Sequence, residues 1–157
     1  MANIENPLFI SLYAQWVDMV LTETSNIDEA NQRLRDLGKE MGSHLYLTTE
    51  LASKTKESVM TREDVAKLID SVYKLLFDRK PTNVDVKSAR DSVRVSDKDC
   101  IWCQEIILEG MRGFGYCEAF SGILEAILEI KGVDAKVFQE LCKATGADIC
   151  TWNVRLV

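Results

Sequence analysis

The sequence has few of the residues on which most enzymes and most small secreted proteins depend. Its 157 residues include one histidine and two prolines. The five cysteines are an odd number, and they are too few for the dense disulfide framework of a small secreted domain. No G-x-S-x-G elbow or Walker phosphate loop occurs, and "GMRGFG" lacks the lysine of such a loop. We therefore expect no catalytic residues and a location in the cytoplasm.

Positive charge and long apolar runs are also scarce. The net charge is −6, and no basic cluster interrupts the chain. Nucleic-acid binding depends on Lys and Arg to neutralise phosphates, so that class of partner is excluded. No run approaches the roughly 18 apolar residues of a spanning helix, and the N-terminus does not resemble a secretory signal. We expect peripheral membrane contact at most.

What the sequence does contain is enough apolar material for one core. Hydrophobic residues make up 46% of the chain, a usual share for a globular protein. No linker, internal repeat or low-complexity segment divides it. We therefore treat residues 1–157 as a single domain.

The first predicted helix is apolar around most of its circumference. It begins at Asn6 and Pro7, because asparagine is a good cap and proline fits the first helical turn. Apolar residues that include Leu12 and Trp16 leave only a narrow polar stripe. Such a helix must be covered on several sides, and part of the cover is expected from a second protomer.

The second predicted helix contains two glycines that require a reason. It begins near Asn26, with Glu29 as the partner in a capping box. Gly38 and Gly42 lie one turn apart near the apolar stripe, where each costs about 1 kcal/mol against alanine. Close approach of another backbone would explain them, and a break in the helix is the alternative. The stripe consists of Ile27, Ala30, Leu34, Leu37, Met41 and Leu45.

The remaining elements alternate between helices and hairpins. Thr61 caps a third helix, and a fourth runs from about 116 to 131 with Glu118 on its solvent-exposed edge. Alternating valines around "SARD" predict one β-hairpin, and "AKVFQELCKA" with "DICTWNVRLV" predicts a second around "TGA". Helices combined with antiparallel hairpins indicate the α+β class.

Cysteine is the remaining candidate for chemistry. If the "TGA" turn pairs Ala144 with Asp148, then Cys142 lies opposite Cys150, about 5 Å apart at the β-carbons. Both sulfurs could then bind one zinc ion, although they could equally be core thiols. Cys100 and Cys103 have the two-residue gap of a zinc or redox pair, with plain packing as the third reading.

Taken together, three features resemble a known family. From about Asn6 to Val157 the chain resembles small subunits of the transport protein particle (TRAPP), in the Bet-type branch, and their prokaryotic relatives, the 4-vinyl-reductase-type ligand-binding domains. The features are Gly38, Met41-Gly42 and Leu45 in the second helix, then Cys117, Gly122 and Glu125 in the later helix, then the terminal hairpin.

The resemblance implies an α+β fold in which the first two helices form a homodimer or heterodimer interface. It also implies an internal hydrophobic cavity for a fatty acyl chain or another apolar ligand. Eukaryotic members are non-catalytic parts of a vesicle tether that also regulates a small GTPase. The position that some subunits acylate on cysteine corresponds to about Ser58, so covalent acylation there is not expected. The implied interface residues are Leu12, Trp16, Leu34, Leu37, Gly38, Met41, Gly42 and Leu45.

The prokaryotic relatives imply a structural zinc site. Their helix cysteine and two hairpin cysteines match Cys117, Cys142 and Cys150. A glutamate completes their site three residues before the first hairpin cysteine, where this chain has Gln139. The fourth ligand could instead be Glu140 (although it is expected on the other face of the strand), Cys100, Cys103 or water.

Three hypotheses follow. The first is a cytoplasmic, dimeric, TRAPP-like assembly subunit that acts through protein contacts, with zinc and an acyl chain as optional ligands. The second is a sensor domain that binds a small apolar molecule in a zinc-stabilised pocket. The third is a thiol oxidoreductase that uses Cys100 and Cys103.

Overall fold

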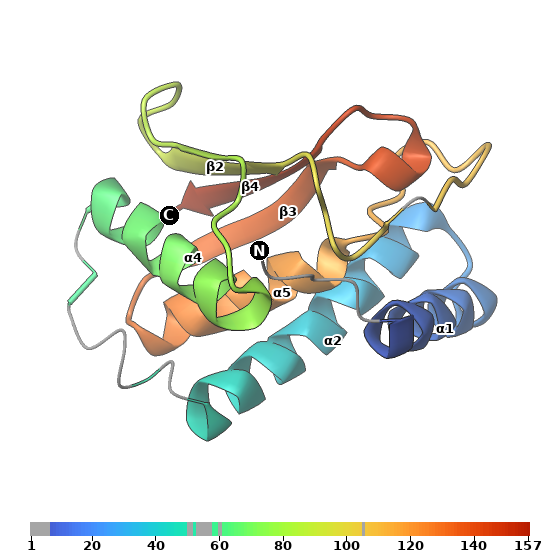
Figure 1. Ribbon diagram of the computed structural model, residues 1–157, viewed down its shortest axis with the longest axis horizontal. Helices are drawn as coiled ribbons and strands as arrows, with labels where there is room; N and C mark the ends of the chain where they lie inside the picture. Colours follow the sequence, from blue (N-terminus) through green and yellow to red (C-terminus); the bar gives the residue numbers. More distant parts are fainter. Residues whose placement is uncertain (1–6, 50–51, 53–57, 60, 105) are drawn as a thin grey trace.

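The structure is a computed structural model that describes residues 7–49, 52, 58–59, 61–104 and 106–157. Helices lie against one face of a single sheet, which confirms the predicted α+β class (Figure 1). The predicted cap Asn6 lies outside the described residues. The elements are α1 (Pro7–Glu23), α2 (Ile27–Thr48), α4 (Arg62–Phe77), β1 (Asn83–Asp85), β2 (Ser92–Asp97), α5 (Glu118–Ile130), β3 (Ala135–Leu141), the 3₁₀ turn η1 (Lys143–Thr145) and β4 (Cys150–Leu156).

The sheet is antiparallel and has the order β1-β2-β4-β3. Both predicted hairpins are present, and β4 joins them by pairing with β2 as well as with β3. Asp97 at the end of β2 is therefore opposite Cys150 at the start of β4. A bulge between Gln139 and Leu141 shifts the register of β3 before it ends.

The predicted caps begin two of the helices. The side-chain oxygen of Asn26 accepts the backbone N–H of Glu29 at 2.8 Å and starts α2. Thr61 and Asp64 exchange the two hydrogen bonds of a capping box and start α4. Helix α2 continues from Ile27 to Thr48, so the alternative of a break at its glycines is wrong.

The glycines of α2 allow close contact with α5. A Cβ atom on Gly38 would lie 1.9 Å from the carbonyl oxygen of Ala119, and one on Gly122 would lie 2.0 Å from that of Arg35. The predicted approach of another backbone is present, and that backbone belongs to the same chain. Leu34 and Gly42 are also buried within it. We therefore correct the expectation for Leu34, Gly38 and Gly42: they pack inside the chain rather than against a second protomer.

An aromatic cluster fills the space between α1, α4 and α5. The indole of Trp102, from the loop after β2, contacts Phe9 and Tyr13 of α1, Phe77 of α4 and Phe120 of α5. Ring centroids lie 4.9 to 6.0 Å apart, within the range of favourable aromatic pairs. This cluster fixes the loop on which two of the cysteines lie. Among the described residues, no helix is long and apolar enough to cross a membrane.

Candidate metal centre

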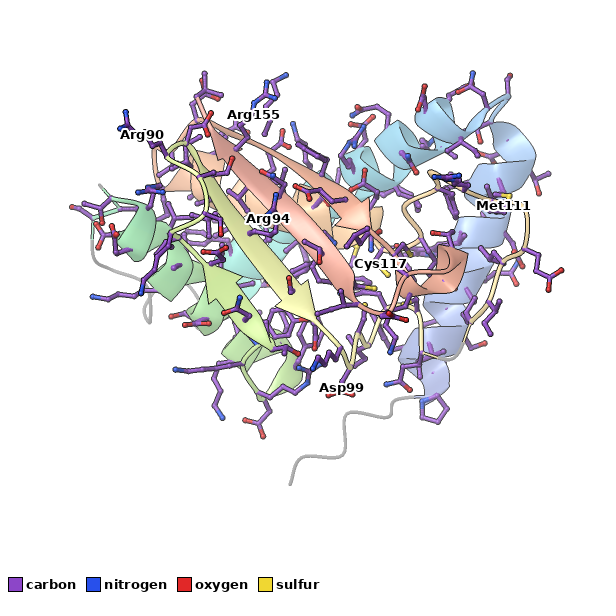
Figure 2. All side chains as sticks on the ribbon, turned by 90° about the horizontal axis from the view of Figure 1, so that it is seen from above. Arg90, Arg94, Asp99, Met111, Cys117 and Arg155 are labelled. Atoms are coloured by element: carbon purple, nitrogen blue, oxygen red, sulfur yellow. The ribbon has the colours of Figure 1, made fainter. Side chains whose placement is uncertain are left out.

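Four cysteines from three separate parts of the chain meet at one end of the sheet. Cys100 and Cys103 lie in the loop after β2, Cys117 precedes α5, and Cys150 begins β4. Their sulfur atoms all lie within 4.8 Å of one another, and all four residues are buried. The Sγ–Sγ distance is 3.6 Å for Cys100 and Cys117, and again for Cys103 and Cys150. Figure 2 shows Cys117 close to other sulfur atoms.

The loop that contains Cys100 and Cys103 is fixed at both ends. At the end of β2, the buried carboxylate of Asp97 accepts hydrogen bonds from the Arg79 guanidinium at 2.7 Å and the backbone N–H of Asp99 at 3.1 Å. Between the two cysteines, Trp102 anchors the turn in the aromatic core. After them, the backbone N–H of Ile106 donates to the carbonyl of Cys103 at 2.9 Å. The sulfurs of Cys100 and Cys103 thus lie on the same side of the loop, next to those of Cys117 and Cys150.

Cys117 is held by its backbone. Its N–H donates to Oε1 of Gln139 at 3.0 Å, and its carbonyl accepts the indole N–H of Trp152 at 3.2 Å. Helix α5 begins at the next residue, so the partial positive charge of the helix N-terminus lies beside this sulfur. These contacts leave the side chain free to face the other three cysteines.

The surroundings set the thiol pKa values in opposite directions. Burial raises the pKa of Cys100 and of Cys117, because a thiolate loses its hydration there. Hydrogen bonds from the neighbouring thiols, first that of Cys100, lower the pKa of Cys103. The backbone N–H of Lys143 also donates to the sulfur of Cys150 at 3.4 Å. The neighbouring thiols, first that of Cys100, raise the pKa of Cys150, so a thiolate is favoured at Cys103 and disfavoured at the other three cysteines of the cluster.

The four sulfurs fit the requirements of a tetrahedral metal ion. Zinc binds thiolates at ~2.3 Å, which places the sulfurs of a four-cysteine site about 3.8 Å apart. The two 3.6 Å separations and the 4.8 Å upper limit bracket that value. A four-thiolate set with no open position matches closed, structural zinc sites.

Comparison with known proteins shows the family. The model of the transport protein particle (TRAPP) component family matches residues 9–155. The chain belongs to the TRAPP component family. The resemblance that we drew from Gly38, Gly42, Cys117 and the terminal hairpin is therefore confirmed. A search of curated protein sequences found no match.

A solved structure shows the same fold. A trafficking protein particle complex subunit 3 from Naegleria fowleri, covalently bound to palmitic acid, superimposes with a TM-score of 0.82. The two sequences are 18% identical, and the alignment covers 96% of this chain and 93% of that one. Helices on one face of a four-stranded antiparallel sheet are thus the architecture of a TRAPP subunit.

This TRAPP-family chain brings together two of the three cysteines in the implied zinc set. Cys117 and Cys150 belong to the four-sulfur cluster, whereas Cys142 lies beside it. The predicted register is present where Leu141 pairs with Thr151, but β3 ends there and Cys142 caps η1. The buried thiol of Cys142 contacts those of Cys103, Cys117 and Cys150, and the residue also lines a surface pocket with Gln139 and Gly115. The sequence indicated Cys100 and Cys103 through their spacing and as alternatives for the fourth ligand, and the structure places both sulfurs in the cluster.

Glu140 does not face the cluster. Its carboxylate accepts a hydrogen bond from the Arg94 guanidinium at 3.3 Å and another from the side-chain amide of Asn153. Asn153 lies on the neighbouring strand β4 and Arg94 on β2 beyond it, on the face of the sheet opposite the cysteines. We therefore correct the expectation that Glu140 could be the fourth ligand, because strand alternation directs its side chain away from the cysteine cluster.

Glu118 is a buried residue that the sequence analysis placed on the solvent-exposed edge of the helix. It is 1% exposed, and its carboxylate accepts hydrogen bonds from Arg35 at 2.5 Å, Ser121 at 2.6 Å and the backbone N–H of Gln139 at 2.6 Å. The burial of Glu118 could have been predicted from its spacing to Gly122. Glu118 precedes Gly122 by four residues and therefore lies on the same helix face, which contacts α2.

Other predicted residues lie on the surface of α1 and α2. Leu12 and Trp16 are 53% and 37% exposed, whereas Leu37, Met41 and Leu45 are half-buried. His44, the single histidine, is exposed on α2. A groove crosses this region, lined by Trp16, Met19, Val20, Glu23, Arg33 and Leu37.

Proposed function

We propose that this chain is a non-catalytic, cytoplasmic TRAPP-like subunit that forms a dimer through α1 and the outer side of α2. It acts as one domain, by protein contacts, in larger assemblies related to vesicle tethering and the regulation of a small GTPase. Family membership supports the trafficking role. Five unpaired, buried cysteines support a reducing compartment.

The observation on which the dimer rests is an exposed apolar stripe on α1. Leu8, Leu12, Trp16 and Met19 follow one another in steps of three and four, and each is at least 37% exposed. Such a stripe on a helix is normally covered. Helix α1 lies at the edge of the molecule, away from the sheet (Figure 1). Leu37 of α2 lines a groove together with Trp16 and Met19, and Met41 and Leu45 are half-buried further along the same helix.

A charge placed in this stripe tests the dimer. We expect Leu12→Glu to convert a dimer into a monomer in sedimentation-velocity measurements, because an interface must desolvate the carboxylate. Ile107→Glu is the matched control: Ile107 is 76% exposed but lies in the loop before α5. Co-expression with other TRAPP-type chains from the same genome tests a heterodimer by the same pair of variants. A wild-type chain that stays monomeric in both settings would contradict the proposal.

A second candidate function is the binding of an apolar ligand, as in a sensor domain. The observation that favours it is the palmitic acid bound to the solved TRAPP subunit of the same fold. Position 58 is an exposed serine, so this chain cannot form a thioester there. We propose that any acyl chain binds without a covalent bond, in the apolar interior beneath the sheet.

A further inference from the structure

We propose that this chain binds one Zn²⁺ through Cys100, Cys103, Cys117 and Cys150, in a closed structural site. The family resemblance implied another set, in which Cys142 and residue 139 complete the coordination. Residue 139 is Gln139, and its amide oxygen is occupied by the backbone N–H of Cys117 at 3.0 Å. Two cysteines of the loop after β2 take the places of that pair.

The positions of the four cysteines favour a metal over simple packing. Cys100 and Cys103 come from one turn, with the two-residue gap of zinc ligands. Each of them lies 3.6 Å from a cysteine of a different element, Cys117 before α5 and Cys150 on β4. A thiol is only a weak donor and acceptor, so four clustered thiols gain little from one another. Binding to zinc would connect the loop to both the helix and the sheet.

The groups around the sulfurs suit the negative charge of a zinc–thiolate site. The backbone N–H of Lys143 points to the sulfur of Cys150 at 3.4 Å. The N-terminus of α5 places its positive dipole end beside Cys117. Such outer contacts orient ligands and raise metal affinity.

Cys142 is the position that separates this ligand set from the implied one. It is buried, and its thiol contacts those of Cys103, Cys117 and Cys150, yet its sulfur is not among the four that all lie within 4.8 Å of one another. Its carbonyl accepts the backbone N–H groups of Thr145 at 3.2 Å and Ala147 at 3.1 Å. Cys142 therefore shapes the turn that carries Lys143, and a serine there retains this backbone role.

The test is metal analysis of the full chain and two variants. We expect one zinc per wild-type chain by elemental analysis after expression with added zinc, and the same for Cys142→Ser. Cys103→Ser should lower the zinc affinity roughly tenfold or more, as measured by competition with a chromogenic chelator. Because Cys103→Ser could also impair folding, a second measurement uses the wild-type chain with Co²⁺ in place of zinc. Its absorption should show a tetrahedral site with four thiolates.

The possible results separate the alternatives. Wild-type chain without metal, with five free thiols after denaturation, would show that the cysteines are core thiols and would overturn the proposal. Fewer free thiols would show disulfides and would also overturn it. If Cys142→Ser lost as much zinc affinity as Cys103→Ser, or if the cobalt spectrum showed fewer than four thiolates, the four-cysteine set would be wrong.

Discussion

At the scale of single residues, the glycines between α2 and α5 determine how closely the two helices approach. Gly38 faces the carbonyl of Ala119, and Gly122 faces the backbone of Arg35. Any Cβ atom at these positions would overlap main-chain atoms, which cannot move aside as a flexible side chain does. The close contact thus depends on the absence of a side chain at Gly38 in α2 and at Gly122 in α5.

Gly38→Ala tests this contact. On an exposed helix this change would add about 1 kcal/mol of stability. Here we expect it to lower the free energy of unfolding by about 2 kcal/mol or more, because the helices must separate. Urea denaturation followed by circular dichroism measures the effect. Glu40→Ala, on the exposed side of the same helix, should change stability by less than about 0.5 kcal/mol.

Gly42→Ala provides a graded comparison with the first variant. A Cβ atom there would lie 2.7 Å from the carbonyl oxygen of Ile123, a less severe overlap than at Gly38. The loss should therefore be smaller than for Gly38→Ala. Equal stability of the wild type and Gly38→Ala would contradict the close contact between α2 and α5.

At the scale of elements, one buried carboxylate joins α2, α5 and β3. Glu118 of α5 accepts hydrogen bonds from Arg35 of α2 and from the backbone of Gln139 on β3. The Arg35 guanidinium is partly buried, and its distance from the carboxylate is 2.5 Å. The same Gln139 then accepts the backbone N–H of Cys117. This chain of contacts holds the start of α5 against the sheet, next to the cysteine cluster.

Arg35→Met tests this junction. We expect it to lower the free energy of unfolding by about 1–3 kcal/mol, because the variant retains the apolar stem but leaves the buried carboxylate without its cation. Chemical denaturation at neutral pH measures the difference. Arg33→Met is the matched control on the same helix, since its ion pair with Glu23 is 54% exposed on both sides and spans 3.4 Å. The control should lose less than about 1 kcal/mol. Equal losses in the two variants would show that Glu118 does not depend on Arg35.

At the scale of the whole molecule, the proposed apolar ligand would have to share the interior with the aromatic cluster. Trp102 contacts residues of α1, α4 and α5, so an acyl chain would have to lie beside this ring or move it. The related TRAPP subunit holds its palmitic acid by a covalent bond. The position that the family resemblance implies for acylation is about Ser58, and all five cysteines of this chain are buried elsewhere.

Mass spectrometry distinguishes the two modes of binding. We expect fatty acid in organic extracts of the purified chain, and an unmodified mass for the denatured chain, because the ligand would be held by apolar contacts alone. An unrelated protein purified in the same way serves as the control for contaminating lipid. A denatured chain that retained the mass of an acyl group would contradict non-covalent binding, and extracts without fatty acid would contradict the ligand itself.

The sequence by itself determined the local elements and the family. Caps at Asn26 and Thr61, apolar periodicity and alternating valines depend on neighbours a few residues apart, so the helices and both hairpins could be predicted. The order of Gly38, Gly42, Cys117 and the terminal hairpin sufficed for the TRAPP resemblance.

Only the tertiary structure decided which distant residues meet. The sequence pointed to Cys142 because it lies near Cys150 along the hairpin, whereas the fold places Cys100 and Cys103 beside Cys117 and Cys150. It likewise turned Gly38 toward the chain's own α5 and buried Glu118. The reason is physical: spacing along a chain fixes which side chains lie together on one face of a helix or strand. The packing of elements far apart in sequence fixes what that face touches.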